Sequence, residues 1–444
     1  MNGFQMTIVG AFIVALIVGV LVFAGVLPGF RAPEGGTGGL VVWWGTIPED
    51  SLGEMLNQIS REHDGDFTLQ YVEKNPETIE NDLVEALALG RGPDLVTLAS
   101  DQLLRQEAKL QPIPYASISR QSFKDTFVLG TSLKDWELMF GSNGVIGLPI
   151  YVDPLVLYYN QDLLTNAKLP LVPRLWKDLA PAIKLLTQAD GRGNINQAAM
   201  AIGSFSNITH AKELLSLLFI QAGNPIVARS NGFPTVTLKD SLGFNKAPAG
   251  EAVAFFLRFT DPTNTLYAWN SSQPEALEAF LRGRLALYFG FGSELSRLAV
   301  QNPQLNFYLT LPPQRDVGAK QVTLGRFYFL GIPLGAKNPT TAYLVSTILA
   351  GSKFGAMIAG AVGLPPARND LLTKAPSDPN LAVLYQAAIL ARDWLDPDPS
   401  KTQAIFRRLA ESIALGQVDA DRAISNADIE LENLLPRRDE NISN

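Results

Sequence analysis

The sequence GLPIYVDPLVLYYNQDLL, at residues 147–164, is apolar enough for a buried strand, yet it carries Asp153 and Pro154 at its centre. Three tyrosines lie in the same run: Tyr151, Tyr158 and Tyr159. One interpretation is two short elements joined by an Asp-Pro turn, because both residue types favour turns. The other is a crossing between two lobes, where the carboxylate would face a cleft instead of a core.

Upstream of this run, residues 40–98 alternate between strand and helix patterns. Strands are predicted at 40–44, 67–73 and 93–98, and helices at 48–62 and 76–92. The helix at 48–62 has Pro48 near its start and apolar residues at helical spacing, and the helix at 76–92 ends at a pair of glycines. This β-α-β-α-β order predicts a parallel sheet with helices on its faces. Ligands of such sheets lie at the carboxyl ends of the strands, which here include Trp44 and Asp101.

Downstream, the same criteria predict further elements without an internal repeat. Helices are predicted at 173–187, 208–223 and 339–361, strands at 199–203, 305–313 and 322–333, and a helix-strand-loop-helix unit at 273–301. Residues 378–435 are predicted to be helical apart from a break at DPDP, residues 396–399. The polar end of the chain, residues 436–444, is predicted to be disordered.

Composition excludes several classes of function. A chain of 444 residues predicts two or three domains or lobes. The net charge of −7, with no long basic run, argues against a nucleic-acid partner. The absence of cysteine excludes disulfides and thiol chemistry. Two histidines, His63 and His210, cannot build a His-rich metal site, so we expect neither a metal nor another cofactor.

The N-terminus predicts a membrane anchor. Residues 7–30 carry no charge and are long enough to span a bilayer. No Lys or Arg precedes the run, which favours a retained signal-anchor over a cleaved signal, although VFA at 22–24 resembles a cleavage site. The glycine-rich residues 31–39 predict a flexible tether. Arg31 alone would place the following chain inside the cell, so charge leaves the orientation open.

The landmarks resemble, in order and spacing, the extracellular solute-binding proteins of ABC importers, specifically the sugar-binding group that includes maltose-binding protein. The resemblance covers residues 40–435 and rests on VVWWG, GRGPDLVTLASDQL, GVIGLPIYVDPLVLYYNQDLL, LWKDLAPAIKLLTQADGRGN, AFLRGRLALYFGFGSEL, AKNPTTAYLVSTILAG, GLPPARNDL and LAESIALGQVDADRAISNADIELENLL. It implies an α/β two-lobe periplasmic-binding-protein fold of type II with several hinge crossings. Lobe one would be 40–150 plus 313–360, and lobe two 155–311 plus 361–435.

The resemblance also implies a function without catalysis. The chain would be a monomeric, membrane-tethered binding protein with its large domain on the extracellular or periplasmic side. It would capture a sugar or oligosaccharide in the interlobe cleft and deliver it to an ABC permease. Two alternatives stay open: an anchored glycoside hydrolase using Asp101 with Asp153 or Glu294, and a ligand-sensing domain without transport. TLASDQ at 97–102 lacks the aromatic that relatives often carry there, and FGFGSEL at 289–295 lacks the Trp that many relatives have near the Ser, which weakens the case for sugar stacking at those points.

Candidate ligand contacts combine aromatic faces with groups that bind hydroxyls. Tyr151 and Asp153 are two residues apart, so on an extended segment both leave the same face. Asp101 follows a strand, with a helix cap as the alternative role. Arg326 alternates to one face with Tyr328, and a buried arginine requires either a ligand or an ion pair.

The remaining candidates come from loops and strand ends. Phe291, Ser293 and Glu294 lie in a glycine-rich loop that matches a ligand-contact loop of the family. Of the two neighbouring tryptophans, Trp44 is chosen over Trp43 for the cleft. Three further candidates, for which packing is the alternative, are Phe205, Asn207 and Trp394.

Overall fold

A computed structural model describes residues 39–131, 133–137, 143–190, 194–230, 232–316 and 318–436. The predictions of an N-terminal anchor over 1–30, of a tether over 31–39 and of a disordered tail over 436–444 concern residues outside these ranges, apart from residues 39 and 436. Within the described ranges, no single helix is both long and apolar enough to cross a bilayer. Helices α12 and α13 meet that test only as a pair bent by 71°.

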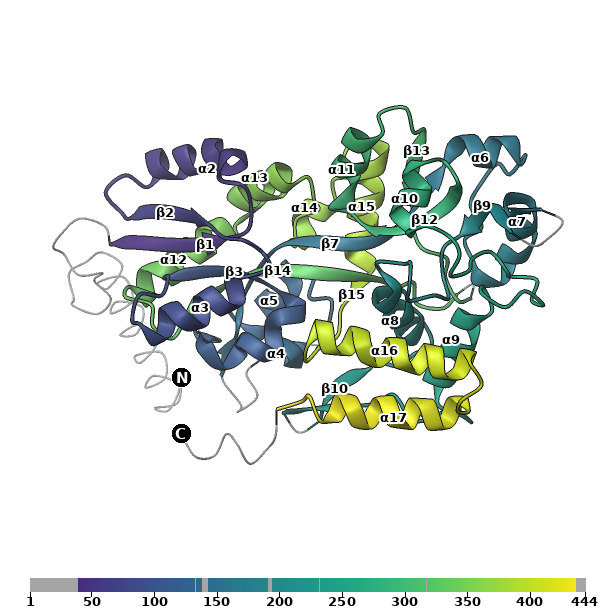
Figure 1. Cartoon of the computed structure of the whole chain (residues 1–444). Coiled ribbons are helices and arrows are strands. Elements are labelled where there is room, and N and C mark those ends of the chain that lie inside the picture. The colour runs from purple at the N-terminus through teal and green to yellow at the C-terminus, as the bar shows by residue number, and fades with distance from the viewer. Residues whose placement is uncertain are drawn as a thin grey trace, which may run out of the picture.

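One eleven-stranded sheet runs through both lobes, in the order β2-β1-β3-β14-β7-β12-β9-β8. In addition, β13 pairs with β7, and β15 and β4 pair with β14. Figure 1 shows β1, β2 and β3 at one end and β9 and β12 at the other, with β7 and β14 spanning the middle. We call the half around β1–β3 the first lobe and the half around β9 and β12 the second lobe.

The first lobe has the predicted parallel arrangement, because β1 pairs in parallel with both β2 and β3. Its strands and helices are β1 (Leu40–Gly45), α2 (Glu49–Glu62), β2 (Thr68–Glu73), α3 (Ile79–Ala88), β3 (Leu95–Ala99), α4 (Leu103–Gln106), β4 (Leu110–Gln111), β5 (Ile113–Pro114), α5 (Arg120–Thr126), β6 (Gly144–Val145), α12 (Pro339–Leu349), α13 (Ser352–Val362) and α14 (Asn369–Leu372). Helices cover both faces of this sheet, and the central strand β3 is buried along its whole length, whereas only some residues of β1 and β2 are buried.

The first crossing is β7 (Gly147–Asn160), a single uninterrupted strand. Its first half pairs with β14, and from Leu155 onward it pairs with β12 and β13. The prediction of a turn at Asp153-Pro154 is therefore wrong, and the crossing between the lobes is confirmed, whereas the Asp153 side chain is buried and does not face an open cleft. Proline has no N–H to donate, and Pro154 lies where the strand exchanges one neighbour for another.

Two further crossings lie beside the first. Strand β14 (Thr323–Pro333) pairs antiparallel with β3 and β7, with a register shift between Tyr328 and Phe329. The short strand β15 (Ala391–Arg392) pairs with the start of β14. Three segments far apart in the sequence thus pass between the lobes next to one another.

The second lobe holds the rest of the chain: α6 (Gln161–Asn166), α7 (Leu179–Leu186), β8 (Gln188–Ala189), β9 (Ile195–Met200), α8 (Ala211–Gln221), β10 (Val227–Ser230), β11 (Phe233–Val236), α9 (Pro248–Leu257), α10 (Ala276–Leu281), β12 (Leu285–Phe291), α11 (Glu294–Gln301), β13 (Phe307–Thr310), α15 (Pro379–Leu390), α16 (Pro399–Ala414) and α17 (Ala420–Glu432). The paired helices α16 and α17 lie along the underside in Figure 1.

Two predicted elements are shifted in the structure, and several elements were not predicted, among them α5, α6, α9 and the hairpin β10–β11. The helix predicted from 173 begins as a 3₁₀ turn, Trp176–Asp178, and becomes α7 at Leu179. The strand predicted at 199–203 lies earlier, at β9. The hairpin β10–β11 and helix α9 have short or irregular apolar patterns, which is why periodicity did not reveal them.

Candidate functional site

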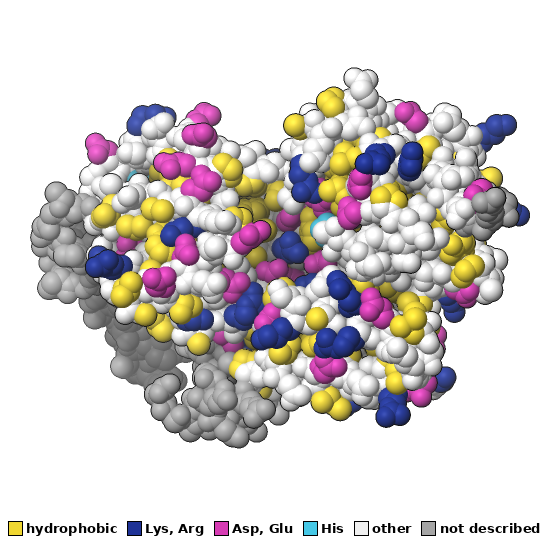
Figure 2. Space-filling view, in the orientation of Figure 1, with side chains coloured by type: hydrophobic (Ala, Val, Ile, Leu, Met, Phe, Trp, Pro, Cys, Tyr) yellow, Lys and Arg dark blue, Asp and Glu magenta, His cyan; other side chains and the backbone are white. Residues whose placement is uncertain are grey.

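Charged side chains gather in a hollow between the two lobes. Figure 2 shows this hollow with Lys or Arg, Asp or Glu, and His atoms at its floor. The deepest part is a cavity of about 20 Å³, lined from both lobes and from the third crossing. That volume has room for about one water molecule. The floor of the hollow is therefore closed by side chains that contact one another.

Arg326, on β14, is the centre of this group. Its Nε lies 3.3 Å from Asp101 Oδ2 of the first lobe, and its Nη2 lies 3.2 Å from Glu213 Oε1 of the second lobe. Its guanidinium carbon stands 4.3 Å from the ring centre of Phe291. Burial lowers the pKa of Arg326, but the two carboxylates outweigh burial and the pKa is raised. The arginine is thus charged and joins the lobes, with 32% of its side chain exposed.

Arg326 was expected to need an ion pair or a ligand, and in the structure it forms ion pairs with Asp101 and Glu213. Asp101 lies in a 3₁₀ turn after β3, and its carboxylate faces Arg326 instead of capping a helix. The helix-cap alternative for Asp101 is therefore wrong. Its side chain keeps 21% of its surface exposed, so a bound molecule can reach it.

Beneath this group lies a lysine that the sequence did not indicate. Lys212 Nζ is 2.8 Å from Asp396 Oδ2, and Thr402 donates a hydrogen bond of 2.7 Å to the other oxygen of Asp396. Burial lowers the pKa of Lys212, but Asp396 and Glu213 outweigh burial and the pKa is raised. The available signal was a Lys-Glu pair at the start of an otherwise apolar helix, together with the acidic DPDP run.

A second carboxyl, that of the partly exposed Asp393, lies at the same floor. It accepts a hydrogen bond from the Ser100 hydroxyl and one of 2.8 Å from the backbone N–H of Trp394. Burial raises the pKa of Asp393 to about 7. The third crossing therefore supplies two acidic side chains to the cleft.

The glycine-rich loop after β12 is held by Glu294. One oxygen of Glu294 lies 2.7 Å from His210 Nε2 and accepts a 2.9 Å hydrogen bond from the N–H of Phe291. The other oxygen accepts a 2.7 Å hydrogen bond from the Tyr288 hydroxyl. Protein groups therefore engage both oxygens, and this arrangement fixes Phe291 under Arg326.

The charge state of this pair follows from its surroundings. Burial raises the pKa of Glu294, but His210 and Tyr288 outweigh burial and the pKa is lowered. Burial lowers the pKa of His210, but Glu294 outweighs burial and the pKa is raised. Both shifts favour an ion pair at neutral pH.

Asp153 lies at the first crossing, opposite Arg326 in the strand register. Its side chain is buried, and its Oδ1 accepts a 2.9 Å hydrogen bond from the N–H of Ser293, a residue exposed at the loop surface. Burial raises the pKa of Asp153. The carboxylate thus ties β7 to the loop after β12, which joins the crossing to the second lobe.

Tyr151 and Tyr328 stack on each other beside this carboxylate. Their ring centres are 4.4 Å apart and their planes differ by 18°. Tyr151 is buried, whereas Tyr328 is partly exposed. The structure therefore brings together eight of the predicted residues around the crossings: Asp101, Tyr151, Asp153, Phe291, Ser293, Glu294, Arg326 and Tyr328.

Trp44 lies at the carboxyl end of β1 in the first lobe. It is partly exposed, and Lys74 Nζ stands 3.9 Å from its ring centre. Trp43 is fully buried and donates a 2.8 Å hydrogen bond to Thr97. The two side chains leave opposite faces of the strand, as alternation requires.

Three predicted residues are engaged inside the protein, and ligand contact for them stays a prediction. Phe205 packs against Phe256, with ring centres 5.8 Å apart. The side-chain amide of Asn207 bonds to the carbonyls of residues 270 and 273 and to Trp269. Trp394 stacks on Phe406, although it also borders the small cavity.

Comparisons with known proteins agree with this architecture. A family model described as bacterial extracellular solute-binding protein matches residues 54–383.

Among the residues that the structure describes, no group of three or more His, Asp or Glu side chains could hold a metal ion.

Three solved structures have a similar fold. A cyclo/maltodextrin-binding protein complexed with maltotetraose has a TM-score of 0.72 and 16% identity, over 90% of this chain and 98% of that one. The sugar-binding protein MalE from Xanthomonas citri has a TM-score of 0.69 and 16% identity, over 89% and 97%. The GacH receptor of Streptomyces glaucescens, solved unliganded and with acarbose, has a TM-score of 0.66 and 16% identity, over 90% and 99%.

Proposed function

Because the chain belongs to the bacterial extracellular solute-binding proteins, we propose that it captures a sugar or oligosaccharide between its lobes and delivers it to an ABC permease. The observation that carries the proposal is the partly exposed group of Arg326, Asp101 and Tyr328 in the interlobe hollow. Guanidinium and carboxylate groups bind hydroxyls, and aromatic rings contact the C–H face of a sugar. The similar proteins solved with maltotetraose and acarbose support this ligand class.

The candidate residues divide into contacts and supports. Arg326 and Asp101 would bind hydroxyls, and Trp44 and Tyr328 would offer ring faces. The buried side chains of Asp153 and Glu294 would hold the loop after β12 in place, since both accept hydrogen bonds from its backbone.

The crossings would act as the hinge. Strands β7 and β14 pass between the lobes around Asp153 and Arg326, which would divide the chain into 40–150 plus 313–360 and 155–311 plus 361–435, except that α13 and α14 extend the first lobe to Leu372. A ligand that contacts both lobes binds the closed form more tightly than the open one, and so shifts the population toward closure.

We propose that the chain does no catalysis. A carboxylate-dependent hydrolase needs an acid and a base free to act on one bond. Both oxygens of Glu294 bond to His210, Tyr288 and backbone, and Asp101 pairs with Arg326. The placement that fits transport is an extracellular or periplasmic domain, acting as a monomer and held to the membrane by residues 1–30 and the tether.

Isothermal titration calorimetry of the full chain against maltooligosaccharides, acarbose and monosaccharides tests the proposal. We expect saturable binding of at least one carbohydrate, weakened in Arg326→Met and unchanged in Arg282→Met. Arg282 is a matched control because its ion pair with Glu278 lies on the exposed surface. Absence of heat with every sugar, together with binding to a peptide or polyamine, would contradict the sugar assignment.

A further inference from the structure

A second cavity lies at the far end of α8 from the interlobe hollow. The start of α8 contributes Lys212 and Glu213 to the cleft, whereas its end contributes Leu218 and Gln221 to this cavity. The cavity has a volume of about 510 Å³. Sites for small molecules typically measure about 300–1,000 Å³. Its size alone makes it comparable to a ligand site.

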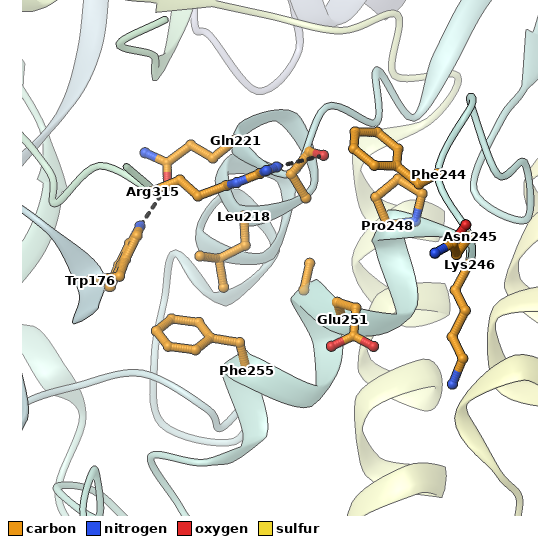
Figure 3. Close-up of a pocket in the computed structure, with 12 residues that line it drawn as sticks. Trp176, Leu218, Gln221, Phe244, Asn245, Lys246, Pro248, Glu251, Phe255 and Arg315 are labelled. Atoms are coloured by element: carbon orange, nitrogen blue, oxygen red, sulfur yellow. Dashed lines mark hydrogen bonds between the residues drawn. The ribbon is translucent and has the colours of Figure 1, made fainter. Parts of the chain in front are cut away.

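Aromatic and aliphatic side chains surround the space. Figure 3 shows Trp176, Leu218, Phe255 and Phe244 arranged around it, from the 3₁₀ turn, α8, α9 and the loop before α9. Trp176 and Phe255 meet edge to face, with ring centres 5.4 Å apart. Three rings from three separate elements therefore face one cavity.

The polar groups of the floor already have protein partners. Trp176 Nε1 donates a 2.6 Å hydrogen bond to Gln221 Oε1. The amide nitrogen of Gln221 donates to the carbonyls of Pro313 and Val322, at 3.0 and 3.1 Å. A sugar placed here would lose hydrogen bonds to water and gain few in return, which is unfavourable. The floor therefore suits an apolar molecule.

The positive and negative charges at the rim of the cavity balance each other, so the rim favours neither an anionic nor a cationic ligand. Lys246 and Glu251 bring one charge of each sign, and Arg315 pairs with Asp316 at 3.0 Å. Arg315 also donates a hydrogen bond to the carbonyl of Ala222 at 3.3 Å. An uncharged occupant leaves this balance intact.

The loop at the rim has an unusual conformation. Leu242 has a φ of 50°, in the left-handed region that side chains with a β-carbon disfavour, and Gly243 follows with a φ of 87°. This loop leaves Phe244 at the cavity edge with 49% of its surface exposed, and Leu242 with 42%. Large exposed apolar groups beside a cavity are typical of binding sites.

We propose that this cavity is a binding site for an uncharged aromatic small molecule, separate from the interlobe cleft. The ligand would lie against the adjoining rings of Trp176 and Phe255, with Phe244 covering it from the rim. The assignment concerns only the second lobe and does not depend on the ligand of the cleft.

Fluorescence titration of the full chain with N-phenyl-1-naphthylamine, an uncharged aromatic probe, tests the proposal. We expect one saturable component that Ala252→Trp removes, since Ala252 lines the cavity and a larger side chain would fill it. Phe244→Ser should weaken that component at least fivefold. Leu242→Ser also replaces an apolar side chain by a serine on the same loop, but Leu242 does not line the cavity. This control variant should leave the saturable component unchanged.

Three outcomes would overturn the proposal. The first is a wild-type titration with no saturable component, in a chain whose circular dichroism shows that it is folded. The second is equal weakening by Phe244→Ser and Leu242→Ser, which would indicate a general apolar surface. The third is a dimer in sedimentation that Phe244→Ser dissociates, which would mean that a second copy of the chain occupies the cavity.

Discussion

Two arginines join the lobes, and they do so in opposite surroundings. Arg326 meets carboxylates of both lobes in the interlobe hollow, with 32% of its side chain exposed. Arg229, on β10 of the second lobe, reaches Glu107 of the first lobe at 2.6 Å, and both side chains are only 2% exposed. The same ionic chemistry is thus open to solvent at one contact and sealed at the other. Exposure, more than charge, separates a candidate binding group from a structural contact.

The sealed contact is imperfectly satisfied. Within the described residues, Arg229 Nε and one oxygen of Glu107 have no hydrogen-bond partner, and Asp135 lies 3.9 Å from Arg229. Burial raises the pKa of Glu107 in spite of the arginine. A buried pair of this kind adds little net stability, but removing one partner leaves a charge uncompensated.

The largest expected effect is therefore at Arg229. Arg229→Met should lower the free energy of unfolding by about 3–5 kcal/mol, because Glu107 is then buried without a cation. Chemical denaturation measures this change. Arg229→Met combined with Glu107→Gln should recover much of the loss, which a double-mutant cycle quantifies. A loss below about 1 kcal/mol would mean that solvent reaches the pair, and the contrast between the two arginines would fail.

At Arg326 we expect a smaller loss of stability than at Arg229, together with a large loss of sugar affinity. Arg326→Met should cost less unfolding free energy than Arg229→Met, because Asp101 is partly exposed and the buried Glu213 keeps Lys212 at 3.7 Å. Sugar affinity should fall about tenfold to a hundredfold if a charged hydrogen bond to a hydroxyl is lost. Calorimetry and denaturation on the same samples separate the two effects. If affinity were unchanged and stability fell as far as for Arg229→Met, Arg326 would be a structural contact.

The pH dependence of stability gives a third, smaller test within the cleft. Because the pKa of His210 is raised on folding, its contribution is complete below about 6.5 and is lost as pH rises through the raised value. Because the pKa of Glu294 is lowered, its contribution is present above about 4.3 and is lost as pH falls through the lowered value. The pair therefore stabilises the fold most at mildly acidic to neutral pH.

Thermal melts of wild type and Glu294→Gln between pH 4 and 9 measure this window. The difference in melting temperature should be largest at mildly acidic to neutral pH and shrink as pH rises through the raised pKa of His210. A difference that stays constant over the range would show that His210 and Glu294 do not titrate as a pair.

Much of the architecture could be predicted because local patterns determine it. The alternation at 40–98 identified the first lobe, and the apolar run at 147–164 identified the crossing, since buried strands read as continuous apolar sequence. The choice between turn and crossing at Asp153 was harder, because Asp-Pro favours turns in isolation. The pairing of β7 with β14 and β12 overrides that preference.

The partners within the cleft could not be predicted in the same way. Arg326 was expected to need an anion, but its partners, Asp101 and Glu213, are more than a hundred residues away along the chain. The contact of Arg229 with Glu107 gave no signal at all, because neither residue stands in a distinctive pattern. Asn207 was predicted as a ligand contact because the sequence alone does not distinguish an asparagine that faces a cleft from one that bonds inside the protein.

The most direct test of the account is a crystal structure of the full chain with a bound maltooligosaccharide. The account predicts that the sugar lies between the lobes, with ring hydroxyls within hydrogen-bonding distance of Arg326 or Asp101 and a sugar ring against Tyr328 or Trp44. A sugar held elsewhere, with the contacts of Arg326 unchanged and the interlobe hollow empty, would contradict it.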